Sequence, residues 1–121
     1  MIKGIKFVGV PVRDQDRALD FYTKKLGFSV VTDQPFNDTQ RWIELRIPGA
    51  DTGLALFTPE GHESRIGEFQ SVAFWTKDVQ RTYDELRSRG VEFTGPPTVA
   101  DWGSSAVFKD QDGNQFALGS K

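Results

Sequence analysis

Hydrophobic and polar positions along the chain follow one order of elements, and the chain contains this order twice. Residues 10–30 have the pattern of an apolar strand, an aspartate, an amphipathic helix, a glycine and a second apolar strand. Residues 72–93 repeat that order. A period of about half the chain indicates a duplicated module within one domain rather than a solenoid of stacked repeats. The matched positions include Asp14 with Asp78, 64 residues later, and Gly27 with Gly90, 63 residues later.

Each copy is predicted to contain one helix. Asp14 is suited to begin the first helix, because its carboxylate can accept hydrogen bonds from the free backbone N–H groups of the first turn. Gly27 suits the left-handed conformation that ends many helices. Asp78 and Gly90 hold the same places around the second helix. Both aspartates are therefore assigned to helix capping.

Eight short segments are predicted to be β-strands, because their side chains alternate in polarity or form short apolar runs bounded by turn residues. The resulting pair of βαβββ modules predicts an α+β fold, with curved mixed sheets around a cavity and the helices on the outer faces. Loops are expected at 32–40 and 98–105. We assign one domain, 1–121, with a first module at 1–57, a linker at 58–70 and a second module at 71–121. The predicted strands are 6–12, 28–31, 42–47, 53–57, 71–75, 91–94, 104–108 and 114–118.

Composition narrows the range of functions. The net charge of −2 and the scattered basic residues give no electrostatic attraction to nucleic acid or to an anionic membrane. The chain has no cysteine, which excludes disulfides, thiolate nucleophiles and cysteine zinc sites. His62 is the only histidine, and its place in the linker predicts an exposed side chain. The sequence shows no signal peptide and no apolar run of membrane length, so a cytoplasmic protein is expected.

The two faces of the predicted sheets differ in chemistry. One face is uniformly apolar and suits helix packing, as at Val10, Leu45 and Leu118. The opposite face mixes small residues with large aromatic ones, which together provide room for a ligand and flat surfaces to hold it. A hydrated face and a face that packs against another subunit are the alternatives. The candidate ligand-binding residues are Phe7, Trp42, Glu44, Arg46, Ala55, Phe57, Ser71, Trp75 and Ala117, with Trp102 from a loop.

Three motifs, in this order, resemble the vicinal oxygen chelate superfamily, which includes glyoxalase I, extradiol dioxygenases, fosfomycin resistance enzymes and bleomycin resistance proteins. The motifs are VRDQDRALDFYTKKLGF at 12–28, SVAFWTKDV at 71–79 and FKDQDGNQFAL at 108–118. The last motif departs from the family in having Gln111 where proline is commoner. The resemblance covers nearly the whole chain. It implies the duplicated fold and a homodimer whose cavities are shared between subunits.

In the metal-dependent members of that superfamily, four inward-facing ligands, usually His and Glu, lie on the first and last strands of the two modules. Transferred residue by residue, these positions are Phe7, Ala55, Ser71 and Ala117. Phenylalanine and alanine have no donor atom, and serine is a weak neutral ligand beside imidazole or carboxylate. We therefore expect no metal and no other cofactor. This disfavours glyoxalase, extradiol dioxygenase and fosfomycin-modifying activities.

Two functions of different class follow. The first is a metal-free binding protein, similar to the bleomycin resistance branch, that sequesters a planar or aromatic compound and so confers antibiotic resistance. The second is a lyase, isomerase or dioxygenase-like enzyme that holds a divalent ion with ligands at unusual positions or uses Glu44 as its acid or base. The competing roles of Glu44 are an ion pair with Arg46 and a polar contact to the ligand. Trp102 either lines the cavity or covers the core, and Trp75 either lines the cavity or belongs to an interface or to the core.

Overall fold

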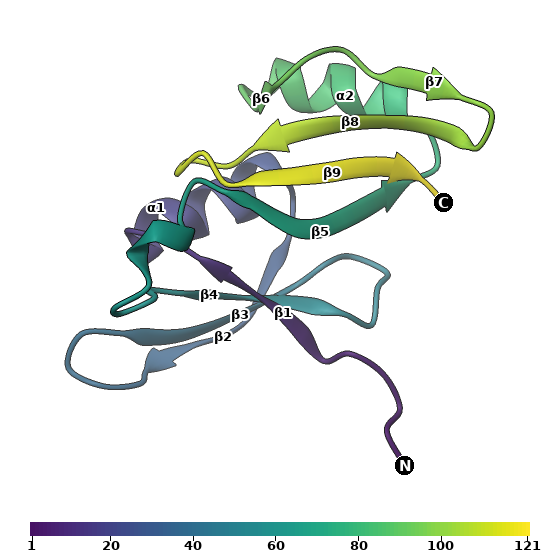
Figure 1. Ribbon diagram of the computed structural model, residues 1–121. Helices are drawn as coiled ribbons and strands as arrows, with labels where there is room; N and C mark the ends of the chain where they lie inside the picture. The colour runs from purple at the N-terminus through teal and green to yellow at the C-terminus, as the bar shows by residue number, and fades with distance from the viewer. The chain divides into compact units, whose positions relative to one another are not determined.

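Each copy of the repeat forms its own β-sheet in the computed structural model, which describes residues 1–121 (Figure 1). The chain divides into two compact units, Met1–Ile66 and Gly67–Lys121, called unit 1 and unit 2 below. Each unit combines a mixed sheet with one α-helix. The predicted α+β class is confirmed.

Unit 1 is a four-stranded sheet with one short helix. Its elements are β1 (Phe7–Pro11), α1 (Gln15–Asp20), a π-helical segment (Phe21–Lys25), β2 (Ser29–Pro35), β3 (Arg41–Arg46), β4 (Gly53–Phe57) and a 3-10 turn (Glu63–Arg65). The strand order is β1-β4-β3-β2, with β1 parallel to β4 and the other pairs antiparallel. Helix α1 lies against β4, on the face of the sheet that carries the apolar core.

Unit 2 repeats this plan with one additional short strand. Its elements are β5 (Phe69–Thr76), α2 (Val79–Ser88), β6 (Glu92–Phe93), β7 (Thr98–Ala100), β8 (Gly103–Lys109) and β9 (Gln115–Ser120). The order is β5-β9-β8-β6, with β5 parallel to β9. Strand β7, which follows β6 in the chain, also pairs with β8, in an antiparallel arrangement. Helix α2 lies against β5, β8 and β9. Neither α1 nor α2 is long and apolar enough to cross a membrane.

The predicted helix ends are confirmed. The Asp14 carboxylate accepts hydrogen bonds from the backbone N–H groups of Asp16 and Arg17, with N–O distances of 2.9 and 3.1 Å. The Asp78 carboxylate accepts a hydrogen bond from the backbone N–H of Arg81, three residues later, at 3.0 Å. The glycines at positions 27 and 90 have φ angles of 80° and 89°, the left-handed region that a residue without a Cβ adopts at little cost.

The apolar faces predicted to receive the helices form the core of each unit. Val10 and Ile43 in unit 1, and Phe116 in unit 2, are fully buried. In the helical segments of unit 1, Ala18 and Tyr22 are also fully buried. Burial of this apolar surface stabilises each unit, so the opposite sheet face is free to vary without loss of the core.

The strand prediction is wrong at two sheet edges. Residues 32–35, predicted as a loop, belong to β2, which pairs with β3 as far as Pro35 opposite Arg41. Proline and aspartate are tolerated there because β2 is an edge strand, and a proline without an N–H loses no ladder hydrogen bond on the open side. Strand β7, also predicted as a loop, pairs with β8. The structure therefore has nine strands rather than eight.

Strand β5 carries a bulge that the repeat does not predict. Between the pair Phe69–Gln115 and the pair Ala73–Ala117, β5 advances by four residues and β9 by only two. Strand β5 therefore contains two additional residues there. Ser71 lies in this bulge with a φ of 58°, which is uncommon for a residue other than glycine. Phe69, within the predicted linker, therefore takes the register position that Phe7 holds in β1. The register pairs are Phe69 with Gln115 and Ala73 with Ala117 in unit 2, against Phe7 with Gly53 and Gly9 with Ala55 in unit 1.

A buried glutamine joins the strands of unit 1. The Gln15 side-chain amide donates to the carbonyl oxygens of Arg41, at 2.7 Å, and Leu56, at 3.0 Å. Its carbonyl oxygen accepts from the backbone N–H of Arg41 at 3.0 Å. One side chain at the start of α1 thus satisfies three backbone groups of β3 and β4.

A buried asparagine has the corresponding role in unit 2. The Asn114 side-chain oxygen accepts from the backbone N–H of Gly67 at 2.8 Å and from the amide of Gln70 at 2.9 Å. Its amide nitrogen donates to the carboxylate of Asp110 at 2.8 Å. The residue is 0% exposed and links the turn between β8 and β9 to the segment that enters β5.

Candidate functional site

The open face of the unit 1 sheet carries the candidate ligand residues of the first module. We use this name for the face opposite the apolar core. The strand register places Gly9, Ala55, Glu44 and Thr32 in one row across β1, β4, β3 and β2. Gly9 has no side chain and Ala55 has only a methyl group, so no large side chain of the row itself projects from β1 or β4. Glu44 adds a carboxylate on the neighbouring strand β3.

Four aromatic rings lie around this row. The Phe7 and Trp42 rings meet edge to face, with centroids 5.5 Å apart and an interplanar angle of 76°. The ring of Phe36, which follows β2, lies 6.1 Å from that of Trp42. The Phe57 ring lies against the backbone of Gly9, because a Cβ at position 9 would be 3.1 Å from Phe57 Cε1. These inclined rings form an apolar aromatic cluster beside a carboxylate.

Glu44 is held by the neighbouring indole. Trp42 Nε1 donates a hydrogen bond to Glu44 Oε1 at 3.1 Å. The other carboxylate oxygen, Oε2, has no hydrogen bond or ion pair within the protein. The alternative of an ion pair with Arg46 is wrong, since Glu44 turns to the residue before it on this face and the Arg46 side chain is exposed. The carboxylate is thus oriented by the protein and keeps one acceptor available.

The candidate residues of unit 2 do not gather into a comparable ring cluster. Trp75 is 55% exposed, which contradicts a place in the core, and Lys121 Nζ lies 4.5 Å from its ring centroid. Trp102, in the turn between β7 and β8, is 70% exposed and does not cover the core. Ser71 is exposed in the β5 bulge, and Ala117 is half-buried. Their side is a shallow surface of small residues with an indole at one end.

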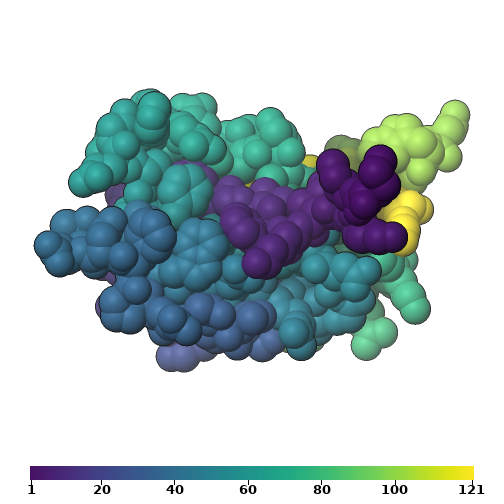
Figure 2. All heavy atoms as spheres, turned by 90° about the horizontal axis from the view of Figure 1, so that it is seen from below, coloured from purple at the N-terminus to yellow at the C-terminus, as the bar shows by residue number.

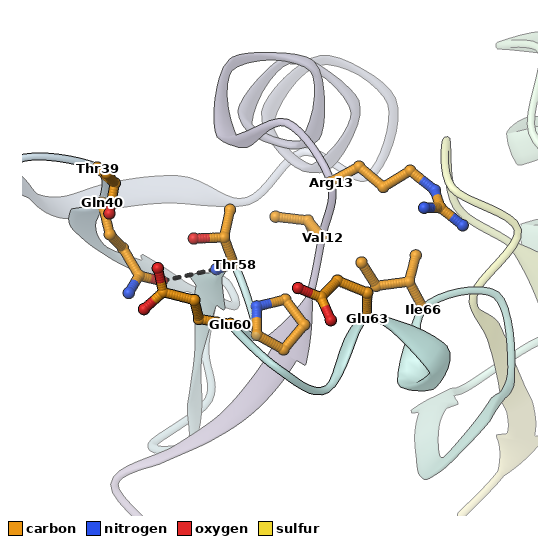
Figure 3. Close-up of a pocket in the computed structure, with 9 residues that line it drawn as sticks. Val12, Arg13, Thr39, Gln40, Thr58, Glu60, Glu63 and Ile66 are labelled. Carbon is orange, nitrogen blue, oxygen red and sulfur yellow. Dashed lines mark hydrogen bonds between the residues drawn. The ribbon is translucent and has the colours of Figure 1, made fainter.

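A cavity of about 430 Å³ lies in unit 1 where β1 and β4 end (Figure 3). Three connecting segments supply its walls: the residues after β1, those before β3 and those after β4. The hydrogen bond from the Thr58 backbone N–H to Gln40 Oε1, at 2.6 Å, closes one side, as the dashed line shows. The lining residues are Val12, Arg13, Thr39, Gln40, Thr58, Pro59, Glu60, Glu63 and Ile66.

The cavity carries a carboxylate that stays ionised. Hydrogen bonds from the backbone N–H groups of Glu63 itself and of Gly61 lower the pKa of the Glu63 carboxyl, and the neighbouring His62 lowers it further. His62 is exposed, as predicted. The sequence does not predict this cavity, because its residues come from loops without periodicity. The only available signal was the cluster of Pro, Gly and carboxylate residues directly after β4.

The residues at the family's metal-ligand positions do not fit a divalent ion. Phe7, Ala55 and Ala117 offer no donor atom, and the β5 bulge puts Phe69 rather than Ser71 in register with Phe7. Neither a phenyl ring nor a single neutral hydroxyl is a competent ligand set. No group of three or more His, Cys, Asp or Glu side chains in residues 1–121 is arranged to hold a metal ion.

Comparison with known proteins places this geometry among relatives. The family model described as Glyoxalase/Bleomycin resistance protein/Dioxygenase superfamily matches residues 4–118. The uncharacterized protein YetH of Bacillus subtilis (strain 168) is 37% identical over 118 residues, which are 98% of this chain and 98% of YetH.

Two of the solved structures with this fold are also similar to this chain in sequence. A member of the same superfamily from Sphaerobacter thermophilus DSM 20745 has a TM-score of 0.90 and 36% identity, with 99% of this chain and 98% of that chain covered. TnmS3, described as an antibiotic binding protein from Streptomyces sp. CB03234, has a TM-score of 0.84 and 35% identity, with 98% and 96% covered.

Proposed function

Because the chain belongs to the glyoxalase/bleomycin resistance protein/dioxygenase superfamily, we propose that it is a binding protein that sequesters a planar or aromatic small molecule without a metal ion. The observation that carries the proposal is the ring cluster on the open face of unit 1. There, the rings of Phe7 and Trp42 meet in the same sheet as Gly9 and Ala55, with the Phe57 ring packed over Gly9. Ring stacking contributes about 0.5–1.5 kcal/mol per ring beyond the burial of area.

The donor set supports a metal-free mode of binding. A divalent ion needs oxygen, nitrogen or thiolate ligands, and the side chains at the positions concerned are phenylalanine, alanine and serine. The likeness to TnmS3 supports the ligand class, since that protein is described as antibiotic binding. Sequestration of an antibiotic is therefore the resistance mechanism that we propose for this chain.

The enzymatic alternative has less support. An acid–base mechanism through Glu44 requires a proton donor or acceptor beside it, within hydrogen-bond reach of the substrate. The partner of Glu44 is an indole N–H, which donates a hydrogen bond but does not exchange protons in catalysis. Its row neighbours are Ala55 and Thr32. Binding without turnover fits these groups better.

Replacement of Trp42 tests the proposed site. We expect Trp42→Ala to weaken the binding of planar aromatic compounds by about tenfold, because it removes a ring of the cluster, and Trp42→Phe to weaken it less. Isothermal titration calorimetry with a panel of planar antibiotics and dyes measures the affinity, and elemental analysis of protein purified without chelator measures the metal content. A stoichiometric divalent ion, or equal affinities in the wild type and Trp42→Ala, would contradict the proposal.

We also propose a homodimer. Unit 1 exposes apolar side chains on its edge strand and N-terminal segment, including Val30, Val31 and Ile5. Figure 2 shows the N-terminal residues, in dark purple, on the surface beside the blue and teal residues of unit 1. Val30 and Val31 are adjacent on the open edge strand β2, and an exposed apolar edge strand is a surface that a second chain can cover. Light scattering after size-exclusion chromatography distinguishes a dimer from a 13.6 kDa monomer.

A further inference from the structure

The Glu44 carboxylate can give the open face of unit 1 a preference for ligands with a charged N–H donor, which ring stacking alone does not provide. A half-buried carboxylate that is hydrogen-bonded through Oε1 has lost orientational freedom but keeps its charge and one acceptor. The protein does not neutralise it with an ion pair. A ligand that offers an N–H donor to Oε2 would form a charge-assisted hydrogen bond, which is stronger than a neutral one.

The aromatic rings on the open faces hold cations of the chain itself. The guanidinium carbon of Arg65 lies 5.7 Å from the centroid of Phe57 in unit 1. In unit 2, Lys121 Nζ lies 4.5 Å from the centroid of Trp75. The negative face of an aromatic ring attracts a cation at such distances. Both contacts involve rings other than Trp42 and Phe7, and they show that a cation can be held against an aromatic ring on these faces.

We propose that the open face of unit 1 selects aromatic ligands that carry a protonated amine. The ligand's ring stacks on one of the Trp42 and Phe7 rings and meets the other at its edge, because the two are inclined by 76°. Its ammonium group donates to Glu44 Oε2, whereas Trp42 Nε1 keeps the carboxylate in place. This inference rests on the proposed binding function and adds the charge of the ligand to it. Trp42 then has two separable roles, as a stacking surface and as the group that positions Glu44.

Two other groups on this face limit the effect. Arg46, two residues along β3, is a cation on the same side, but its side chain extends into solvent and makes no ion pair with Glu44. Arg65 is placed over Phe57. A ligand amine is therefore repelled weakly by exposed, screened guanidinium groups and attracted at short range by one fixed carboxylate.

A pair of naphthalene probes tests the inference with the full-length chain. One probe carries an aminomethyl group, which is protonated at pH 7, and the other is its neutral N-acetyl derivative. We expect the wild type to bind the cationic probe about tenfold more tightly than the neutral one, as a charge-assisted hydrogen bond implies. Glu44→Gln should weaken the cationic probe much more than the neutral one and so abolish this ratio.

The controls separate the charge from the ring. Arg46→Gln should leave the ratio unchanged or raise it, because it removes a cation and not the acceptor. Trp42→Phe should weaken the neutral probe slightly and the cationic probe more, so that the ratio falls about threefold, because an aromatic ring stays while Glu44 loses its indole partner. Thermal melts of each variant, with unchanged midpoints, show that the fold is intact.

The outcomes that overturn the inference differ from those that overturn the proposed function. Equal affinity of the wild type for both probes, or an equal loss of both in Glu44→Gln, contradicts charge selection while the binding function stands. Failure of both probes to bind to the wild type contradicts aromatic binding at this face and the inference with it. Retention of the full ratio in Trp42→Phe contradicts the positioning role of Trp42 alone.

Discussion

Unit 1 and unit 2 have the same sheet plan, but the central row of the open face differs between them. In unit 1 the row contains Gly9, Ala55 and Glu44. In unit 2 the equivalent register positions hold alanines 73 and 117 and Val107. A carboxylate in one copy thus corresponds to an isopropyl group in the other.

The aromatic residues differ in the same way. Trp42 lies two residues before Glu44 in β3. The residue two before Val107 in β8 is Ser105, so a serine in unit 2 takes the place of the tryptophan. The apolar faces, in contrast, are buried in both copies. Core packing constrains one face of each sheet, whereas a ligand constrains the other face only in the copy that contacts it. The carboxylate and the ring cluster are thus features of unit 1 that unit 2 does not repeat, in agreement with the proposed site.

The largest expected effect concerns the buried amides that each unit uses to satisfy its backbone. Asn114→Ala should lower the free energy of unfolding by about 3 kcal/mol, because it removes the buried hydrogen bonds to the Gly67 N–H and to the charged carboxylate of Asp110. Gln15→Ala should cost about 2 kcal/mol, because the groups it leaves are neutral. Urea unfolding followed by circular dichroism measures both.

An exposed glutamine provides the control for these two variants. Gln34→Ala removes a side chain of similar chemistry from the surface of β2 and should change the unfolding free energy by less than about 0.5 kcal/mol. If Gln15→Ala matches this control, then its hydrogen bonds to β3 and β4 do not stabilise unit 1. If Gln15→Ala lowers the unfolding free energy more than Asn114→Ala does, then the charged partner Asp110 is not the reason for the larger loss expected in unit 2.

A smaller effect is expected at the glycine of the unit 1 row. Gly9→Ala adds a Cβ 3.1 Å from Phe57 Cε1, so the ring must move by a few tenths of an ångström. We expect a loss of about 1 kcal/mol in stability and weaker binding of planar ligands. Ala73→Gly makes the opposite change at the equivalent exposed position of unit 2 and should leave binding unchanged. Calorimetric titration and thermal melts give both quantities, and an effect of the unit 2 variant on affinity would place the ligand there as well.

The smallest effect is a pH dependence confined to unit 1. Two hydrogen bonds of 3.0 Å from Arg41 lower the pKa of Asp33 below its ordinary value of 3.8. Because the folded-state pKa is lower than the unfolded one, the ionised carboxylate stabilises the fold above about pH 4, and this contribution is lost as the pH falls through the lowered value.

Urea unfolding at several pH values tests this contribution. Asp33→Asn should be less stable than the wild type at pH 7 by less than about 1 kcal/mol, since the pair is partly exposed, and the difference should shrink as the pH falls below the ordinary pKa of 3.8. In unit 2, Glu92 and Lys109 are 3.6 Å apart and Glu92 is 71% exposed, so Glu92→Gln should have no measurable effect. A difference for Asp33→Asn that persists at acid pH would mean that it arises from packing and not from charge.

The candidate site was only partly predictable from the sequence. Alternation along β3 and β4 placed Trp42, Glu44 and Phe57 on one face, because side chains two residues apart share a side of a strand. The partner of Glu44 could not be chosen this way, since Trp42 and Arg46 are both two residues distant from it. Phe36 was missed because it lies in an irregular segment, and the cavity after β4 was missed for the same reason.

By itself, the sequence determined the duplicated α+β plan, the capping of both helices, the apolar faces and the lack of metal donors at the family's ligand positions. These properties depend on local periodicity and on residue chemistry, and both can be read without knowledge of contacts. The tertiary structure decided the additional edge strands, the bulge at Ser71 and the hydrogen bond between Trp42 and Glu44. These depend on which strands pair and in which register, a choice made by residues far apart in the chain.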